Sequence, residues 1–170
     1  MTESTIPQAL FTRLLDAPQA LVFKVWTERE HVIHWMHPKP FARVECEHIE
    51  VRPGGRLSYN LFLPDGKVIH SRSIYREIEP PSRIVYDEVC SRDGEVFHRA
   101  RMTVSLTAQG EQTLLSIHGL FEWPPENDRG WSLADMQEGW TDGWGDNSDL
   151  MQAHLARLQT IHNDNGSTPT

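Results

Sequence analysis

Apolar and polar residues alternate along much of the first two thirds of the chain, and such alternation predicts half-buried β-strands. Turn-forming triplets, Pro-Asp-Gly at 64–66 and Arg-Asp-Gly at 92–94, separate neighbouring runs. Short turns join strands antiparallel, so the pattern predicts a meander. The expected strands, about seven in all, cover residues 9–15, 41–51, 56–63, 67–79, 83–90, 95–106 and 112–121.

Helical spacing of apolar residues occurs in three places. Asp16 and Pro18 are typical of a helix start, and they predict a short helix after the first strand. A second short helix is expected over residues 27–36. The third and longest helix is expected from Ser132 to the neighbourhood of Ile161, with a break near its glycines.

The order of elements is therefore one strand, two short helices, six strands and a long helix, which is an α+β arrangement. A sheet with one apolar face must cover that face, and the C-terminal helix is the only element long enough to do so. We expect a curved antiparallel sheet that grips this helix, with the two short helices closing one end. The prediction is a single domain over residues 1–162 and a disordered tail over 163–170.

The long helix contains Gly139 and Gly143, and a tryptophan follows each of them. A glycine inside a helix costs roughly 1 kcal/mol relative to alanine. We expect the two glycines to thin the helix where it faces the sheet, leaving a hollow walled by Trp140 and Trp144. The alternative is that the indoles fill this space.

Polar residues on the expected inner face of the strands are candidates for binding a ligand in that hollow. The apolar residues Val68 and Ile74 are taken to mark the inward phase of their strand, which also directs His70 and Arg72 inward. A β-bulge would reverse such an assignment. The predicted ligand-binding residues are Trp26, Trp35, Tyr59, His70, Tyr86, Glu88, His98, Phe121, Met136, Trp140 and Trp144.

Composition and charge exclude several classes of protein. The 170 residues are 38% hydrophobic and carry a formal net charge of −8, which argues against nonspecific nucleic-acid binding. No apolar stretch is long enough to span a membrane. The start of the chain does not resemble a signal peptide, so we expect a cytoplasmic protein in which Cys46 and Cys90 remain unpaired. The sequence allows a homodimer without requiring one.

Motifs for metal binding, nucleophilic catalysis and phosphate binding are not evident. His31, His34 and His37 lie close together in sequence, but they cannot all share one helix face, and the favoured interpretation is surface histidines. The chain has no G-x-S-x-G and no phosphate-cradling G-x-x-x-x-G-K. No metal and no cofactor are therefore predicted, and catalytic residues are not assigned.

Four segments in this order resemble a known family. They are "DAPQALVFKVWTEREHVIHWM", "VRPGGRLSYNLFLPDG", "EIEPPSRIVYDE" and "MQEGW". Over about Leu10 to Leu158 the chain is similar to START-like (SRPBCC) helix-grip proteins. Within them it resembles the family named after the activator of the heat-shock protein 90 ATPase. The resemblance implies a START/Bet v-like helix-grip fold, but it supplies no catalytic motif, and the segment between Trp123 and Met136 is longer and more polar than the family pattern.

Three functions follow from these residues and this resemblance. The favoured hypothesis is a protein that binds a small apolar or aromatic ligand. The second is an enzyme of the cyclase or hydrolase type, in which an inward pair such as His98 and Glu88 acts as acid and base. The third is an interaction module with a chaperone partner, by analogy with the protein that names the family.

Overall fold

The computed structural model describes residues 6–122 and 132–165. The elements in chain order are β1 (Gln8–Leu15), α1 (Gln19–Thr27), α2 (Arg29–Val32), β2 (Arg43–Ile49), β3 (Arg56–Phe62), β4 (Val68–Glu79), β5 (Arg83–Arg92), β6 (Glu95–Gln109), β7 (Gln112–Phe121) and α3 (Leu133–Asn165). The expected order of strands and helices is confirmed.

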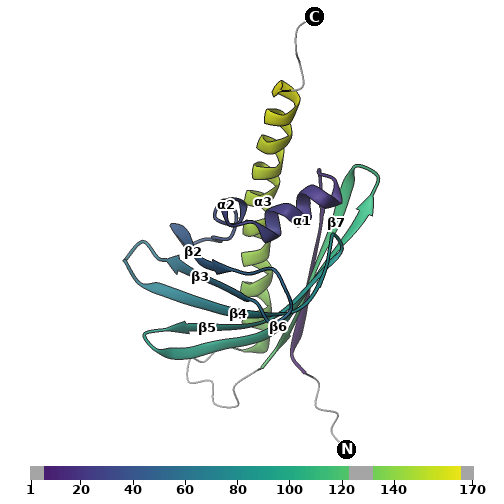
Figure 1. Cartoon of the computed structure of the whole chain (residues 1–170). Coiled ribbons are helices and arrows are strands. Elements are labelled where there is room, and N and C mark those ends of the chain that lie inside the picture. Colours follow the sequence, from purple (N-terminus) through teal and green to yellow (C-terminus); the bar gives the residue numbers. More distant parts are fainter. Residues whose placement is uncertain (1–5, 123–131, 166–170) are drawn as a thin grey trace, which may run out of the picture.

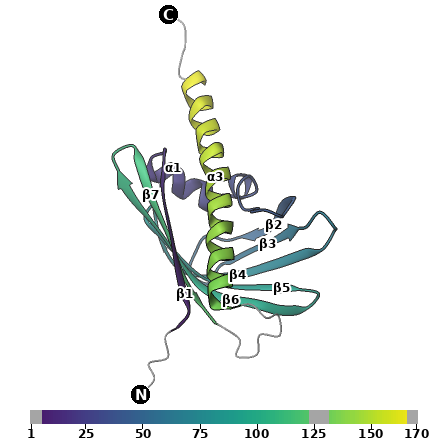
Figure 2. The same ribbon diagram turned by 180° about the vertical axis from the view of Figure 1, so that it is seen from behind.

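The strands form one seven-stranded sheet in the order β1-β7-β6-β5-β4-β3-β2. The strands from β2 to β7 follow each other in space as in sequence, because short turns join them antiparallel. The first strand returns to pair with the last, with Gln8 opposite Leu120 and Leu15 opposite Thr113. The sheet curves around α3, while α1 and α2 lie across the opening beside it (Figures 1 and 2). This is the predicted α+β helix-grip architecture.

The long helix is fastened to β1 at several points along its length. Gln137 donates a hydrogen bond from Nε2 to the carbonyl of Gln8 at 2.5 Å, near the start of α3. Further along, Arg13 forms an ion pair with Asp149 at 2.5 Å. The helix is continuous through its glycines and extends to Asn165, so the expected break is absent and residues 163–165 are helical. The rest of the predicted tail lies outside the described residues.

The glycines of α3 do not bring its backbone close to the sheet. A Cβ added at Gly139 would meet no heavy atom within 4 Å among the described residues, and one added at Gly143 would meet only Pro38, at 3.9 Å. Pro38 belongs to the segment after α2 rather than to a strand. Trp144, in contrast, is only 7% exposed and packs into the core. The indole, not the glycine stripe, therefore forms the inward surface of the helix here.

The inward phase predicted for β4 is wrong. Ser71, Ser73 and Tyr75 are nearly inaccessible and face α3, whereas His70 and Arg72 lie on the outer face of the sheet. The prediction relied on Val68 and Ile74 as markers of the inside, but both are half-buried on the outer face. The true inward positions carry two serines, which are small enough to be buried. Ser71 donates its hydroxyl to Glu88, whereas Ser73 Oγ has no hydrogen-bond partner among the described residues.

The turn between β2 and β3 depends on its two glycines. Gly54 has a φ of +80°, a backbone conformation that side chains with a Cβ rarely adopt. A Cβ at Gly55 would lie 2.0 Å from the carbonyl oxygen of Glu50, so this position must remain glycine. The turn thereby fixes how β3 starts and which of its residues face inward.

The hydrophobic core lies between the inner face of the sheet and the three helices. Its largest fully buried side chains are Trp35, Tyr75, Tyr86, Leu15, Ile84, Met102, Leu115, Ile117, Met151, Leu155, Val22 and Val25. Cys46 and Cys90 are unpaired, as expected. Among the described helices, none has the length and apolar character needed to cross a membrane.

Candidate functional site

A buried carboxylate, Glu88, is the centre of a polar cluster on the inner face of the sheet. Tyr59 donates a hydrogen bond from its hydroxyl to Glu88 Oε1 at 2.8 Å, and Ser71 donates another to the same oxygen at 2.9 Å. The second oxygen, Oε2, lies 3.6 Å from Nε2 of His98. The cluster spans four neighbouring strands, β3 to β6, because cross-strand pairing aligns their inward residues in adjacent rows.

The surroundings keep Glu88 ionised despite its burial. Burial by itself raises the pKa of this carboxyl, but the contact with His98 and the hydroxyl donors Tyr59 and Ser71 outweigh it and lower the pKa below its ordinary value. The same environment raises the pKa of the Tyr59 hydroxyl well above its usual range, first through burial and then through the charge of Glu88. The cluster therefore presents a fixed negative charge beside neutral phenols.

A row of aromatic side chains continues from this cluster across the interior. His98 lies 5.8 Å from Phe121, and Phe121 lies 5.7 Å from Trp140, as measured between ring centroids. Trp140 meets Trp144 edge-on at 6.2 Å. Trp144 is stacked on Trp26 at 5.7 Å, and Trp26 lies 4.7 Å from Trp35. One continuous wall thus runs from the polar cluster along α3 to α1 and α2.

The structure brings most of the predicted ligand-binding residues into this one array. The array contains Trp26, Trp35, Tyr59, Glu88, Phe121, His98, Trp140 and Trp144. Tyr86 is buried two residues before Glu88 on the same face, and Met136 packs against the core one turn before Trp140. Only His70 is separate, because it lies on the outer face and contacts Asn60 Oδ1 at 2.8 Å.

Several residues at this interior surface were missed by sequence reasoning. Ser71 is one, and its signal was available: Tyr75, four residues later, is a better marker of the inside than Ile74. Buried polar atoms without a hydrogen-bond partner among the described residues form a second group. Besides Nε1 of Trp26, which was predicted, they are Ser73 Oγ, Asn147 Oδ1, Ser148 Oγ and His154 Nδ1. Polar atoms in such positions normally bind water or a ligand.

The exposure of the inward side chains to solvent differs between the two halves of α3. Met151 and Leu155, in the C-terminal half of the helix, are fully buried, while Met136 and Trp140 in the N-terminal half are only partly buried. His98, opposite this N-terminal half, keeps 19% of its side chain exposed. The N-terminal half of α3, next to His98, is thus less completely buried than the C-terminal half.

His31 of α2 and the nearby His34 contact a histidine of α3, which the sequence did not indicate. His154 of α3 is only 5% exposed. Its Nε2 lies 2.9 Å from Nδ1 of His31, and its ring is stacked on His34 at 4.5 Å. Burial and then the neighbouring His34, His31 and Arg157 lower the pKa of His154 to about 4. His154 is therefore neutral and structural at neutral pH.

One group of potential metal ligands occurs in the described part of the chain. Ligand atoms of Glu28, Glu30 and His31 lie within 4.8 Å of one another. Glu30 is exposed, and exposed acidic side chains commonly approach this closely without an ion. Nothing else at this position points to a metal, so the group receives no assignment.

Comparison with known proteins supports the same fold. Residues 16–156 match the family described as "Activator of Hsp90 ATPase homolog 1-like protein". Protein CV1439 from Chromobacterium violaceum superimposes with a TM-score of 0.74 at 18% identity, covering 88% of this chain and 96% of that protein. Protein NE0264 from Nitrosomonas europaea gives a TM-score of 0.75 at 19% identity, with 93% and 99% covered. A protein from Arthrobacter aurescens gives 0.75 at 20% identity, with 92% and 90% covered. No curated protein matches the sequence.

Proposed function

The chain belongs to the family of Activator of Hsp90 ATPase homolog 1-like proteins, and from that premise we propose that it binds a small, largely apolar or aromatic ligand. The proposed site lies between the inner face of the sheet and the N-terminal half of α3. Aromatic side chains supply its apolar wall, and the Glu88 cluster supplies its polar end. This combination is the usual composition of small-molecule sites.

The observation that carries the proposal is the buried, ionised Glu88 on an inner surface that is not fully covered. A buried carboxylate is costly unless it is well partnered, and an apolar side chain at this position would pack without that cost. Two hydroxyl donors and a histidine instead stabilise it, next to an aromatic wall in which Trp140 is partly exposed. A polar group retained at such a position supports a role in orienting a bound molecule.

The chemistry of the cluster restricts the ligand. Glu88 Oε1 already accepts two hydrogen bonds, and among the described residues the ion-pair contact of Oε2 is with His98, at a long 3.6 Å. An oxygen with free lone pairs can accept a further hydrogen bond, whereas a second anion beside it would be repelled. The expected ligand is therefore uncharged or cationic at this end, with a hydroxyl, amide or amine donor attached to an apolar or aromatic body.

Native mass spectrometry of the protein isolated from cell extract tests the proposal. We expect an additional mass of a few hundred daltons on the wild-type protein, of the size that fits a typical small-molecule pocket. Glu88→Gln removes the charge and should lower the occupied fraction at least about fivefold. Glu45→Gln is the matched control, since Glu45 is an exposed residue of β2 that pairs with Arg43, and it should leave the occupancy unchanged. Equal loss in both variants, or no bound mass under any isolation condition, would reject the proposal.

A second candidate function, acid–base catalysis, is favoured by the pairing of His98 with Glu88. The 3.6 Å separation lets the carboxylate orient the imidazole, which is the arrangement that general bases use. In this version the bound molecule is a substrate, and His98→Ala abolishes its turnover while the protein still folds and binds. Unchanged turnover in His98→Ala would leave binding alone as the function.

A further inference from the structure

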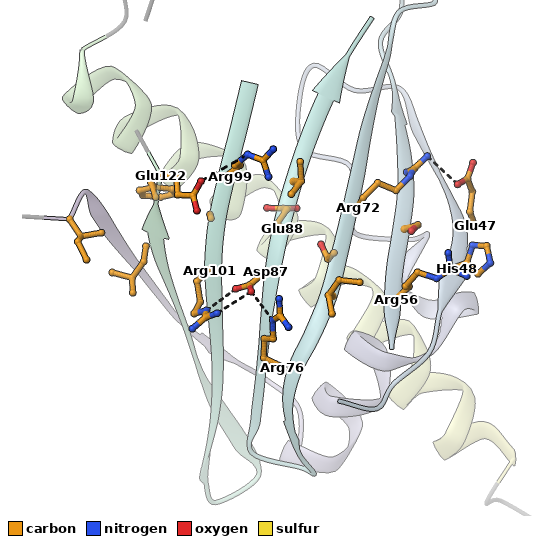
Figure 3. A pocket seen from close by; sticks show the side chains of 18 residues that line it. Glu47, His48, Arg56, Arg72, Arg76, Asp87, Glu88, Arg99, Arg101 and Glu122 are labelled. Carbon is orange, nitrogen blue, oxygen red and sulfur yellow. Dashed lines mark hydrogen bonds and ion pairs between the residues drawn. The ribbon is translucent and has the colours of Figure 1, made fainter. Parts of the chain in front are cut away.

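We propose a second binding site, on the outer face of the sheet, for a compact organic anion with an apolar body and two or more carboxylate or phosphate groups. This site is separate from the interior one, because the sheet itself lies between them. It occupies a hollow of about 850 Å³ on the face that α3 does not cover (Figure 3). The volume lies within the ordinary range of small-molecule sites, roughly 300–1,000 Å³.

Arginines surround this outer hollow. The five that line it come from three strands: Arg56 from β3, Arg72 and Arg76 from β4, and Arg99 and Arg101 from β6. The whole chain has 16 lysines and arginines and a net charge of −8, so five arginines around one hollow are a local exception to an acidic surface. A guanidinium matches the geometry of carboxylate and phosphate groups, which it binds through two parallel hydrogen bonds.

Strand pairing produces the arrangement. In one row across the sheet, Arg72 of β4 is opposite Val89 of β5, and Val89 is opposite Arg99 of β6. In the next row, Arg56 is opposite Ile74. Each row therefore places an apolar side chain beside arginines, and Figure 3 shows the labelled arginines around the centre of the hollow. Arginines two strands apart are separated by roughly 10 Å at the backbone, which suits a ligand with anionic groups on both sides of an apolar body.

The charges of the site are not balanced within the protein. Three outward carboxylates, Glu47, Asp87 and Glu122, face the five guanidinium groups, which leaves a surplus of two positive charges. The fourth carboxylate of the lining, Glu88, is bonded on the inner face. Asp87 is shared by two arginines, since it accepts hydrogen bonds from Arg76 and Arg101, each at 2.7 Å.

Two of the existing ion pairs are weak enough to be exchanged for those of a ligand. Arg99 is 4.0 Å from Glu122, and both side chains are at least half exposed. Arg72 is 3.2 Å from Glu47, with both about half exposed, while its Nη1 donates to the carbonyls of Tyr59 and Ser71 and so holds the guanidinium in place. Exposed pairs of this kind contribute about 0–1 kcal/mol each. Arg56 forms no ion pair with any described residue and is free to bind an anion.

Fluorescence anisotropy with pyranine, a flat hydroxypyrene that carries three sulfonates, tests the site directly. Sulfonates stand in for carboxylate or phosphate, and the pyrene stands in for the apolar body. We expect saturable binding to the wild-type chain at low salt with a Kd below about 100 μM, weakening as salt is added. Absence of saturation up to about 1 mM at low salt would overturn the proposal.

Paired variants separate a built site from general charge attraction. Arg56→Gln with Arg72→Gln should weaken binding at least about tenfold. Arg83→Gln with Arg157→Gln is the matched control, since it removes the same charge outside the hollow and should change Kd by no more than about twofold. Glu122→Gln removes a competing carboxylate and should strengthen binding by about threefold. Equal weakening in the two double variants would overturn the proposal.

Two further comparisons identify which chemical groups of the probe are recognised and which face of the sheet it binds. Inorganic sulfate and a pyrene with a single sulfonate should each bind at least about tenfold more weakly than pyranine, because each lacks one half of the recognised chemistry. Trp140→Leu should leave the Kd for pyranine unchanged, since Trp140 faces the interior and does not line the outer hollow. Loss of pyranine binding in Trp140→Leu would place the probe in the interior and overturn the outer site.

Discussion

The two ends of the interface between the sheet and α3 are built differently. Near the C-terminal half of the helix, Leu115 and Ile117 of β7 and Met151 and Leu155 of α3 are completely buried. Near the N-terminal half, the inner face carries the Glu88 cluster, and Trp140 is partly exposed. The first end has the composition of a packed core. The second carries hydrogen-bonded polar groups, and the neighbouring Met136 and Trp140 are only partly buried.

The largest expected effect is at the packed end. Leu155→Ala should lower the free energy of unfolding by roughly 3 kcal/mol, because it removes a fully buried side chain and leaves a cavity. Met136→Ala, at the other end of the same helix, should cost no more than about 1 kcal/mol, since Met136 is only partly buried. Urea denaturation measures both values. Similar losses in the two variants would remove the distinction between the ends.

The next largest expected effect is a loss of stability on changing the Glu88 cluster at the polar end. Glu88→Ala leaves the hydroxyl groups of Tyr59 and Ser71 without their acceptor, and should lower stability by about 2 kcal/mol. Tyr59→Phe removes a single donor and should cost about 1 kcal/mol. If the two changes are neutral in urea denaturation, the cluster does not exist as described.

The free energy of unfolding should fall by about 1 kcal/mol at acidic pH because of His154, a residue of α3 that is buried where α3 contacts α2. Its folded pKa, about 4, is below the unfolded value of about 6.5, so the unfolded chain takes up a proton first. Stability is therefore fully present above about pH 6.5 and is lost as the pH falls towards about 4. The facing titratable groups are His31, His34 and Arg157, with Glu28 beyond His31.

Thermal unfolding between about pH 7 and pH 5 measures this effect, with His154→Leu as the comparison. The wild-type protein should lose more stability over this interval than the variant does. Parallel pH profiles of the two proteins would show that folding leaves the pKa of His154 unchanged and would contradict its assignment to the packed end.

The smallest expected effect is a gain. Gly139→Ala adds a methyl group where no described heavy atom lies within 4 Å, and it improves helix propensity, so it should raise stability by up to about 1 kcal/mol. Gly55→Ala is the contrasting control, because its Cβ would collide with the carbonyl of Glu50. A loss of stability in Gly139→Ala would show that this part of α3 is more tightly covered than its surroundings indicate.

The sequence predicted the fold well because the signals for it are local. Alternation, turn triplets and the order of elements are sufficient to give the strands, their antiparallel neighbours and the helix that covers them. The inward phase of β4 was not predictable in the same way, since Val68 and Ile74 are apolar residues on the outer face. The pairing of His154 with His31 is also nonlocal, because 123 residues separate them.

The candidate site was predictable only in part. Tyr59, Glu88 and His98 were expected to face inward, and they do so, since the irregularity in the pairing of β5 with β6 begins only beyond the pair Cys90 and His98. The outer arginines were not predicted as a site, because arginine on an exposed face of a sheet is ordinary. Only the pairing of the strands from β3 to β6 shows that these arginines surround one hollow.

Two-dimensional NMR of the indole N–H groups, recorded while small aromatic alcohols and amides are added, tests the central claim most directly. We expect at least one of these compounds to shift the indole N–H resonances of Trp140 and Trp144. The resonance of Trp35 should stay in place, because its N–H is bonded to the carbonyl of Val25 at 2.9 Å. These shifts should disappear in Glu88→Gln. If no compound moves Trp140 or Trp144, or if the shifts persist unchanged in Glu88→Gln, the polar end of the interface is not a ligand site.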